Sequence, residues 1–64
     1  MIELTKLNKK KFILNSDLIE TVESTPDTII TLQTGKLLLV LEPPGEVIER
    51  IIDFRRKLQI LPED

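Results

Sequence analysis

The chain has 64 residues, of which 41 % are apolar and 31 % charged, and its formal net charge at pH 7 is −2. This length falls below the roughly 100 to 200 residues of a typical domain, so we expect one foldable globular domain over residues 1–64. The absence of cysteine and histidine excludes disulfides, thiolate or imidazole metal sites and cysteine or histidine nucleophiles. We therefore expect no cofactor, no metal and no enzyme activity.

Alternating apolar and polar residues in the first half of the chain predict three short strands. The expected ranges are 2–7, 11–14 and 18–24. A polar turn at residues 8–10 joins the first two strands as a hairpin. The third segment also fits one turn of a helix, because Leu18, Ile19 and Val22 are spaced three and four residues apart.

Two further strands are expected over residues 28–34 and 36–42. Turn-forming residues bound them, since Pro26 and Asp27 precede the first and Gly35 separates the two. The second strand contains a continuous apolar run from Leu37 to Leu41, which cannot present one face to water in the usual alternating way. We therefore expect both faces of this strand to be covered.

The apolar period becomes helical over residues 46–59. The stripe consists of Val47, Ile51, Phe54 and Leu58, widened by Ile48 and Ile52. Acidic residues lie near the start of this segment and basic residues near its end, which matches the helix dipole. The whole pattern predicts an α+β domain, in which a small antiparallel sheet of four to five strands, either an open meander or barrel-like, is followed by one C-terminal amphipathic helix. A frayed tail is expected after the helix, over residues 61–64.

Two basic clusters leave contact with nucleic acid open as an alternative. They consist of Lys6, Lys9, Lys10 and Lys11 at the first turn and Arg50, Arg55, Arg56 and Lys57 on the helix. The negative net charge and the scarcity of aromatic residues, which are limited to Phe12 and Phe54, favour protein contacts instead. The alternative is a small oligomeric RNA-binding or regulatory β-barrel.

Self-association is expected because a chain of this size buries only about 60 % of its surface on folding and has neither disulfides nor metals to support it. We expect a homo-oligomer that contacts its partners through one strand face and a few polar positions. The candidate interaction residues are Leu38, Val40, Asp27, Arg55, Arg56 and Lys57.

Several segments, taken in their order and spacing, resemble the FlbD family of flagellar and swarming-motility proteins. They are Ile2-Glu3-Leu4-Thr5-Lys6-Leu7-Asn8, Phe12-Ile13-Leu14-Asn15, Leu18-Ile19-Glu20-Thr21-Val22-Glu23, Thr25-Pro26-Asp27-Thr28-Ile29-Ile30-Thr31-Leu32, Gly35-Lys36 and Val40. The resemblance covers about residues 1–58. It implies an accessory protein of the bacterial flagellum that supports swarming and motor power, with a motor or basal-body protein as partner and with no catalytic residues.

Two departures from the family pattern concern turns. Lys9 stands where the family usually has glycine in the first turn, and Thr34 stands where it usually has asparagine before Gly35. Both departures weaken the sequence signals that identify hairpin type. The geometry of the two turns is therefore left open.

The N-terminus has no basic stretch followed by an apolar run of about 7 to 15 residues, so we expect no signal peptide. The longest apolar run, Leu37 to Leu41, is far shorter than the roughly 20 residues that span a bilayer. We therefore expect the protein to stay in the cytoplasm and to reach a membrane only through a partner.

Overall fold

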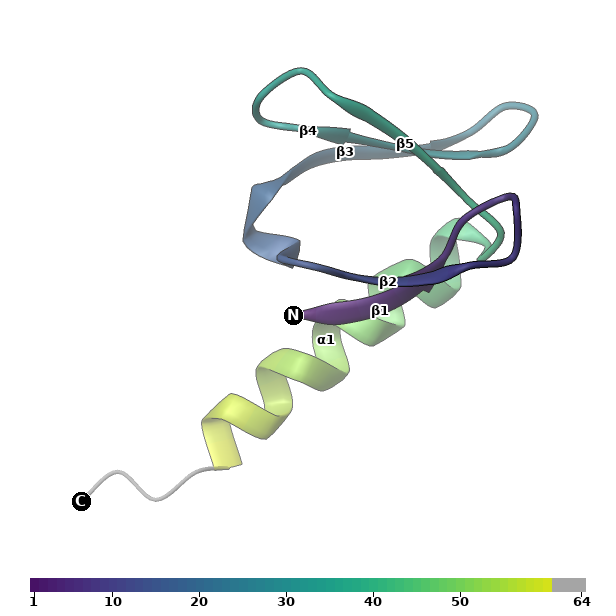
Figure 1. Cartoon of the computed structure of the whole chain (residues 1–64). Helices are drawn as coiled ribbons and strands as arrows, with labels where there is room; N and C mark the ends of the chain where they lie inside the picture. The colour runs from purple at the N-terminus through teal and green to yellow at the C-terminus, as the bar shows by residue number, and fades with distance from the viewer. Residues whose placement is uncertain (61–64) are drawn as a thin grey trace.

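The computed structural model describes residues 1–60 and consists of five antiparallel strands followed by one helix (Figure 1). The strands are β1 (Ile2–Thr5), β2 (Lys11–Leu14), β3 (Ile19–Ser24), β4 (Thr28–Leu32) and β5 (Leu37–Val40). A short 3-10 helix, η1 (Ser16–Leu18), precedes β3, and α1 spans Pro44–Ile60. The predicted α+β class is confirmed. The frayed tail expected over residues 61–64 lies outside the described residues.

The strands form two small sheets. β1 pairs with β2, and β3, β4 and β5 form a three-stranded sheet in that order. The two sheets meet at an isolated bridge between Lys6 and Val40, and the Leu41 backbone N–H donates to the Thr5 carbonyl at 2.8 Å. Of the two arrangements that the sequence left open, the closed barrel is therefore excluded.

The β1–β2 hairpin turns through the three residues 7–9. The Lys9 N–H donates to the Lys6 carbonyl at 2.8 Å, and the Lys6 N–H donates to the Lys10 carbonyl at 2.9 Å. Lys9 has a φ of 73°, in the left-handed region that disfavours residues with a Cβ. This combination is the three-residue hairpin loop in which a turn is followed by one left-handed residue.

The β4–β5 hairpin has the same geometry with a different residue at the left-handed position. The Gly35 N–H donates to the Leu32 carbonyl at 2.8 Å, and the Leu32 N–H donates to the Lys36 carbonyl at 2.8 Å. Gly35 has a φ of 91°, which glycine adopts without steric conflict. Lys9 therefore occupies the position that glycine fills in the second hairpin, and both turns are of one type.

Strand β3 begins at Ile19, and its pairing with β4 shifts register between Ile19 and Thr21. A register shift of this kind adds a residue to one strand and changes which side chains share a face. Ile19 and Val22, three residues apart, are consequently both half-buried against the core. This spacing explains why the same residues also fitted a helical turn.

A small aliphatic core lies between the two sheets and the helix. Its buried members are Ile2, Leu4, Leu14, Ile30, Leu32, Val40 and Val47. Ile51 and Phe54 pack against these residues from α1, so the central line of the predicted stripe faces the core as far as Phe54. Ile48 and Ile52, which were expected to widen the stripe, are instead exposed. Leu58 continues the stripe but is exposed.

Helix α1 extends beyond the strands on which it packs. Figure 1 shows its C-terminal turns projecting away from the strands, and the described chain is accordingly elongated, measuring 44 × 23 × 18 Å. Over residues 1–60, no helix combines the length and the apolar character that crossing a bilayer would need. Because the C-terminal part of α1 projects beyond the strands, it presents several of its sides to solvent.

Candidate functional site

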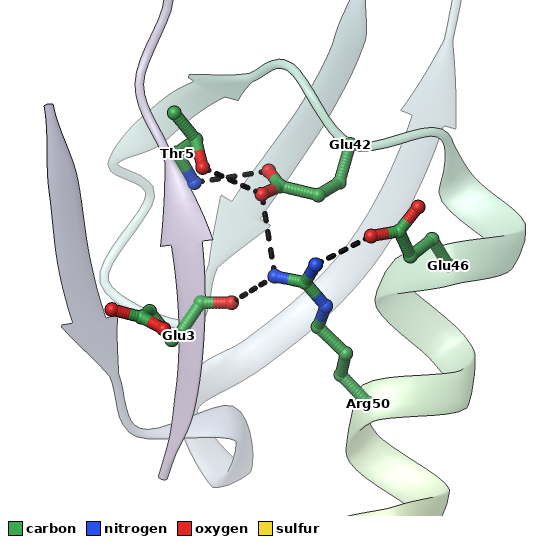
Figure 2. Close-up of polar contacts among 5 residues, drawn as sticks. All are labelled: Glu3, Thr5, Glu42, Glu46 and Arg50. Carbon is green, nitrogen blue, oxygen red and sulfur yellow. Dashed lines mark hydrogen bonds and ion pairs between the residues drawn. The ribbon is translucent and has the colours of Figure 1, made fainter. Parts of the chain in front are cut away.

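Glu42, directly after β5, is the buried charged residue of the described chain, with 8 % of its surface exposed. Its carboxylate accepts two hydrogen bonds from Thr5, one from the backbone N–H at 3.0 Å and one from the hydroxyl at 2.7 Å (Figure 2). These bonds fasten the segment after β5 to the end of β1. They also hold the two sheets together beside the Lys6 bridge.

Arg50, in the second turn of α1, joins this carboxylate to the helix (Figure 2). Its Nη1 lies 3.3 Å from Glu42 Oε2 and also donates to the Glu3 carbonyl. Its Nη2 pairs with Glu46, one turn earlier on α1. We call Thr5, Glu42, Glu46 and Arg50 the polar latch, because one guanidinium group ties α1 to β1 and to the connection that follows β5.

Opposing effects set the pKa of Glu42. Burial works to raise it, whereas the backbone N–H and hydroxyl of Thr5, the backbone N–H of Glu42 itself and the positive charge of Arg50 lower it. The lowering effects prevail, so the pKa lies below its ordinary value of 4.5. The ionised form is therefore favoured, and in this form the carboxylate accepts the bonds from Thr5 and Arg50 that hold β1, the segment after β5 and α1 together.

Sequence reasoning missed the polar latch, although part of it was visible. Glu46 and Arg50 are four residues apart on a predicted helix, which is the spacing of an intrahelical ion pair. The bonds between Thr5 and Glu42 join residues 37 positions apart. No local pattern indicates such a contact.

The side chains of β5 alternate between the core and solvent. Val40 is buried and Leu38 packs against the core, so these two candidate residues face the chain's own interior. Leu37, Leu39 and Leu41 point the other way and are 58 %, 39 % and 50 % exposed. The apolar face that remains available to a partner thus consists of the second set.

A groove of about 480 Å³ adjoins this face, between β5 and the turn of the β1–β2 hairpin. Its lining residues, which define the β5 groove, are Lys6, Leu7, Asn8, Phe12 and Leu37–Leu39. Leu38 and Phe12 are half-buried and form its inner wall. The Lys6 Nζ lies 5.5 Å from the centre of the Phe12 ring, close enough for a cation–π contact.

Lys6 is the basic residue in the lining of the β5 groove. Lys9, Lys10 and Lys36 are close to lining residues in sequence and are exposed, but they do not line the groove. Among the described residues, no carboxylate lines the groove. The groove therefore combines an apolar interior with one positively charged side chain.

The remaining candidate residues lie on other surfaces. Arg55 is exposed and lies near Asp17, with 3.7 Å between Nη2 and Oδ1. Arg56 and Lys57 are exposed on the projecting part of α1, and Asp27 is exposed in the turn between β3 and β4. That turn and the end of α1 lie at opposite ends of the molecule (Figure 1). The structure therefore does not gather the candidate residues into one site.

The model of the FlbD family, described as flagellar and swarming motility proteins, matches residues 1–59. No curated protein and no solved structure is significantly similar to the chain. The family match spans all five strands and nearly all of α1. The chain therefore belongs to the FlbD family and, with it, to flagellar and swarming motility.

Proposed function

We propose that this protein is a non-enzymatic cytoplasmic accessory protein of the bacterial flagellum, which supports swarming and motor power through contacts with other proteins. The observation that carries this proposal is the exposed apolar face of Leu37, Leu39 and Leu41 together with the adjoining β5 groove. A contiguous apolar surface with a polar rim is typical of a protein interaction site. Family membership supplies the motility context.

The chemistry of the β5 groove favours a partner segment with apolar side chains next to acidic residues. The lining includes the basic side chain of Lys6 and no carboxylate among the described residues, while the interior is formed largely by leucines. Opposite charges accelerate association and fix orientation, and burial of the apolar side chains supplies most of the affinity. We propose a flagellar motor or basal-body protein as the source of this segment.

RNA binding is the alternative, and Lys6 together with the exposed lysines close to it in sequence is the observation that favours it. Single-stranded RNA is held by a positively charged groove together with exposed aromatic rings on which its bases stack. Phe12 is partly buried with Lys6 over its ring, and Phe54 packs against the core. Protein contact therefore agrees better with the surface of the chain.

The exchange Leu37→Gln tests the proposal. Leu37 lines the β5 groove, and Ile13 is a matched control because it is 63 % exposed on β2, outside the groove. We expect Leu37→Gln to impair swarming on soft agar while the melting temperature of the purified protein changes little. Ile13→Gln should leave both unchanged. Equal swarming in the two strains would contradict a role for the groove.

The RNA alternative is tested with one further variant. A filter-binding assay with single-stranded RNA compares the unaltered chain with a variant in which Lys9 and Lys10 are replaced by Gln. If RNA is retained by the unaltered chain only, and swarming follows RNA retention but is insensitive to Leu37→Gln, RNA binding replaces our proposal. We also propose that the protein forms a homo-oligomer.

A further inference from the structure

The side of α1 that points away from the strands carries an apolar ridge that the described residues leave exposed. Ile48 and Ile52 are 49 % and 43 % exposed, and their spacing of four residues places them on one side of the helix. A shallow groove of about 400 Å³ is lined by Glu49, Ile52, Asp53 and Arg56. We call Ile48, Glu49, Ile52 and Arg56 the outer helix face.

Charges of opposite sign are separated along α1. The acidic residues are Glu46, Glu49 and Asp53, and the basic residues that follow them are Arg55, Arg56 and Lys57. Arg50 interrupts the acidic part but is turned toward β1 by the polar latch. Within residues 1–58, neither Glu49 nor Arg56 makes an ion pair. They are seven residues, or about two turns, apart, so they flank Ile52 on the same side.

We propose that the outer helix face binds the same face of a second copy of this chain, with the two helices antiparallel across a two-fold axis. The axis passes near Ile52, so the isoleucines of both copies cover each other. Each Glu49 then lies opposite Arg56 of the partner subunit. A parallel pair would place like charges together, which is unfavourable.

The shape of the chain permits this arrangement. In an antiparallel pair, the first part of each helix, which carries the strands, lies opposite the last part of the other, which projects free of them (Figure 1). The strands of the two copies are therefore kept apart. This inference does not depend on the β5 groove or on its proposed partner.

The expected dimer is weak, because one face of one helix buries less than the roughly 800 Å² per partner of a standard stable interface. Its formation should depend on protein concentration, and it should weaken at high ionic strength because the charge pairs are exposed. The quantity to measure is the dissociation constant, from sedimentation equilibrium of the full chain at low salt over a series of concentrations.

Charge reversal tests the pairing. Glu49→Arg alone and Arg56→Glu alone should each weaken association by roughly tenfold, because both symmetric contacts change from attraction to repulsion. An equimolar mixture of the two single variants should associate as the unaltered chain does, and so should the double variant. Glu20→Arg, at an exposed carboxylate on β3 and not on α1, is the control and should have no effect. Circular dichroism checks that every variant keeps its helix.

Four results would overturn the proposal. One is a purely monomeric unaltered chain at the highest concentration reached. A second is association that survives both single reversals, which would indicate a parallel pair. A third is association that is lost with Leu37→Gln, which would assign the interface to β5. The last is failure of the mixed single variants to associate. Swarming scored with the Leu37→Gln strain remains a separate test of the proposed function.

Discussion

Lys9 and Gly35 occupy the same left-handed position in two hairpin turns of one type. The two positions therefore differ mainly in the side chain that they carry. A residue with a Cβ is disfavoured there by roughly 1 to 2 kcal/mol. We therefore predict that Lys9→Gly raises the free energy of unfolding by up to about 1 kcal/mol, the greater entropy of glycine in the unfolded chain offsetting part of the gain. Urea denaturation measures this change.

Gly35→Ala is the matched opposite exchange. No atom lies within 4 Å of a Cβ built at Gly35, so the expected loss of about 1 kcal/mol comes from the backbone alone. The two exchanges should shift the urea midpoint in opposite directions. Shifts of the same sign would show that the turns are not equivalent.

Glu42 makes the stability of the fold depend on pH. Because its pKa is lowered in the folded chain, its contribution to stability is fully present above the unfolded value of 4.5 and is lost as the pH falls through the folded pKa. We predict that the urea midpoint of the unaltered protein declines as the pH falls below about 4.5 and that Glu42→Gln reduces this decline. At neutral pH, Glu42→Gln should lower the free energy of unfolding by about 1 to 3 kcal/mol, since the bonds from Thr5 and Arg50 lose a charged acceptor.

Glu20→Gln, at an exposed carboxylate on β3, serves as control and should leave the neutral-pH midpoint nearly unchanged. A pH profile for Glu42→Gln that runs parallel to that of the unaltered protein would assign the acid sensitivity to other groups.

The individual strands and the helix were predictable because each carries a local pattern. The helix was predicted over residues 46–59 and spans Pro44–Ile60. Alternation located the first four strands to within a few residues, and the continuous apolar run located the fifth. The pairing of those strands was not predictable, because Lys6 and Val40 meet through contacts distant in sequence. The two sheets meet at this bridge, and no local pattern in the sequence indicates where one sheet ends and the other begins.

Strand β5 shows where pattern alone gives no answer. Five consecutive apolar residues carry no alternation, so the sequence cannot indicate which of them face the core. Leu38 and Val40 were predicted as interaction residues. Val40 is buried in the core, whereas Leu38 packs against the core and also lines the β5 groove. An exchange at Val40 therefore reports on folding, whereas exchanges at Leu37 or Leu39 report on the exposed face.

The molecule as a whole separates its proposed contact surfaces from the residues that hold it together. The core has seven buried apolar residues, and the polar latch fastens α1 across it. The outer helix face lies outside both, and so do the exposed leucines of the β5 groove, Leu37 and Leu39, although Phe12 and Leu38 in its inner wall pack against the core. Since a domain of this size has little stability to spare, surfaces that can be altered without loss of the fold allow contacts to be tested one at a time.

Replacing Arg55, Arg56 and Lys57 together with Gln tests this separation. Exposed charges near a helix end contribute only about 0.3 to 1 kcal/mol each, and the contact of Arg55 with Asp17 is long and exposed, so the fold should remain intact at moderate temperature. Association should weaken and lose most of its dependence on salt, because the basic half of the self-complementary pattern is removed. Melting temperature at low concentration and sedimentation at low and high salt measure the two effects.

Swarming and RNA retention of the same triple variant then distinguish the functional proposals. If dimerisation presents the β5 groove to a motility partner, swarming should fall with the dimer while the monomer keeps its melting temperature. An RNA-binding protein would instead lose nucleic-acid affinity and show a shallower salt dependence of that affinity, because fewer phosphates would be neutralised. Intact swarming together with lost RNA retention would therefore contradict the assignment of this surface to protein contacts.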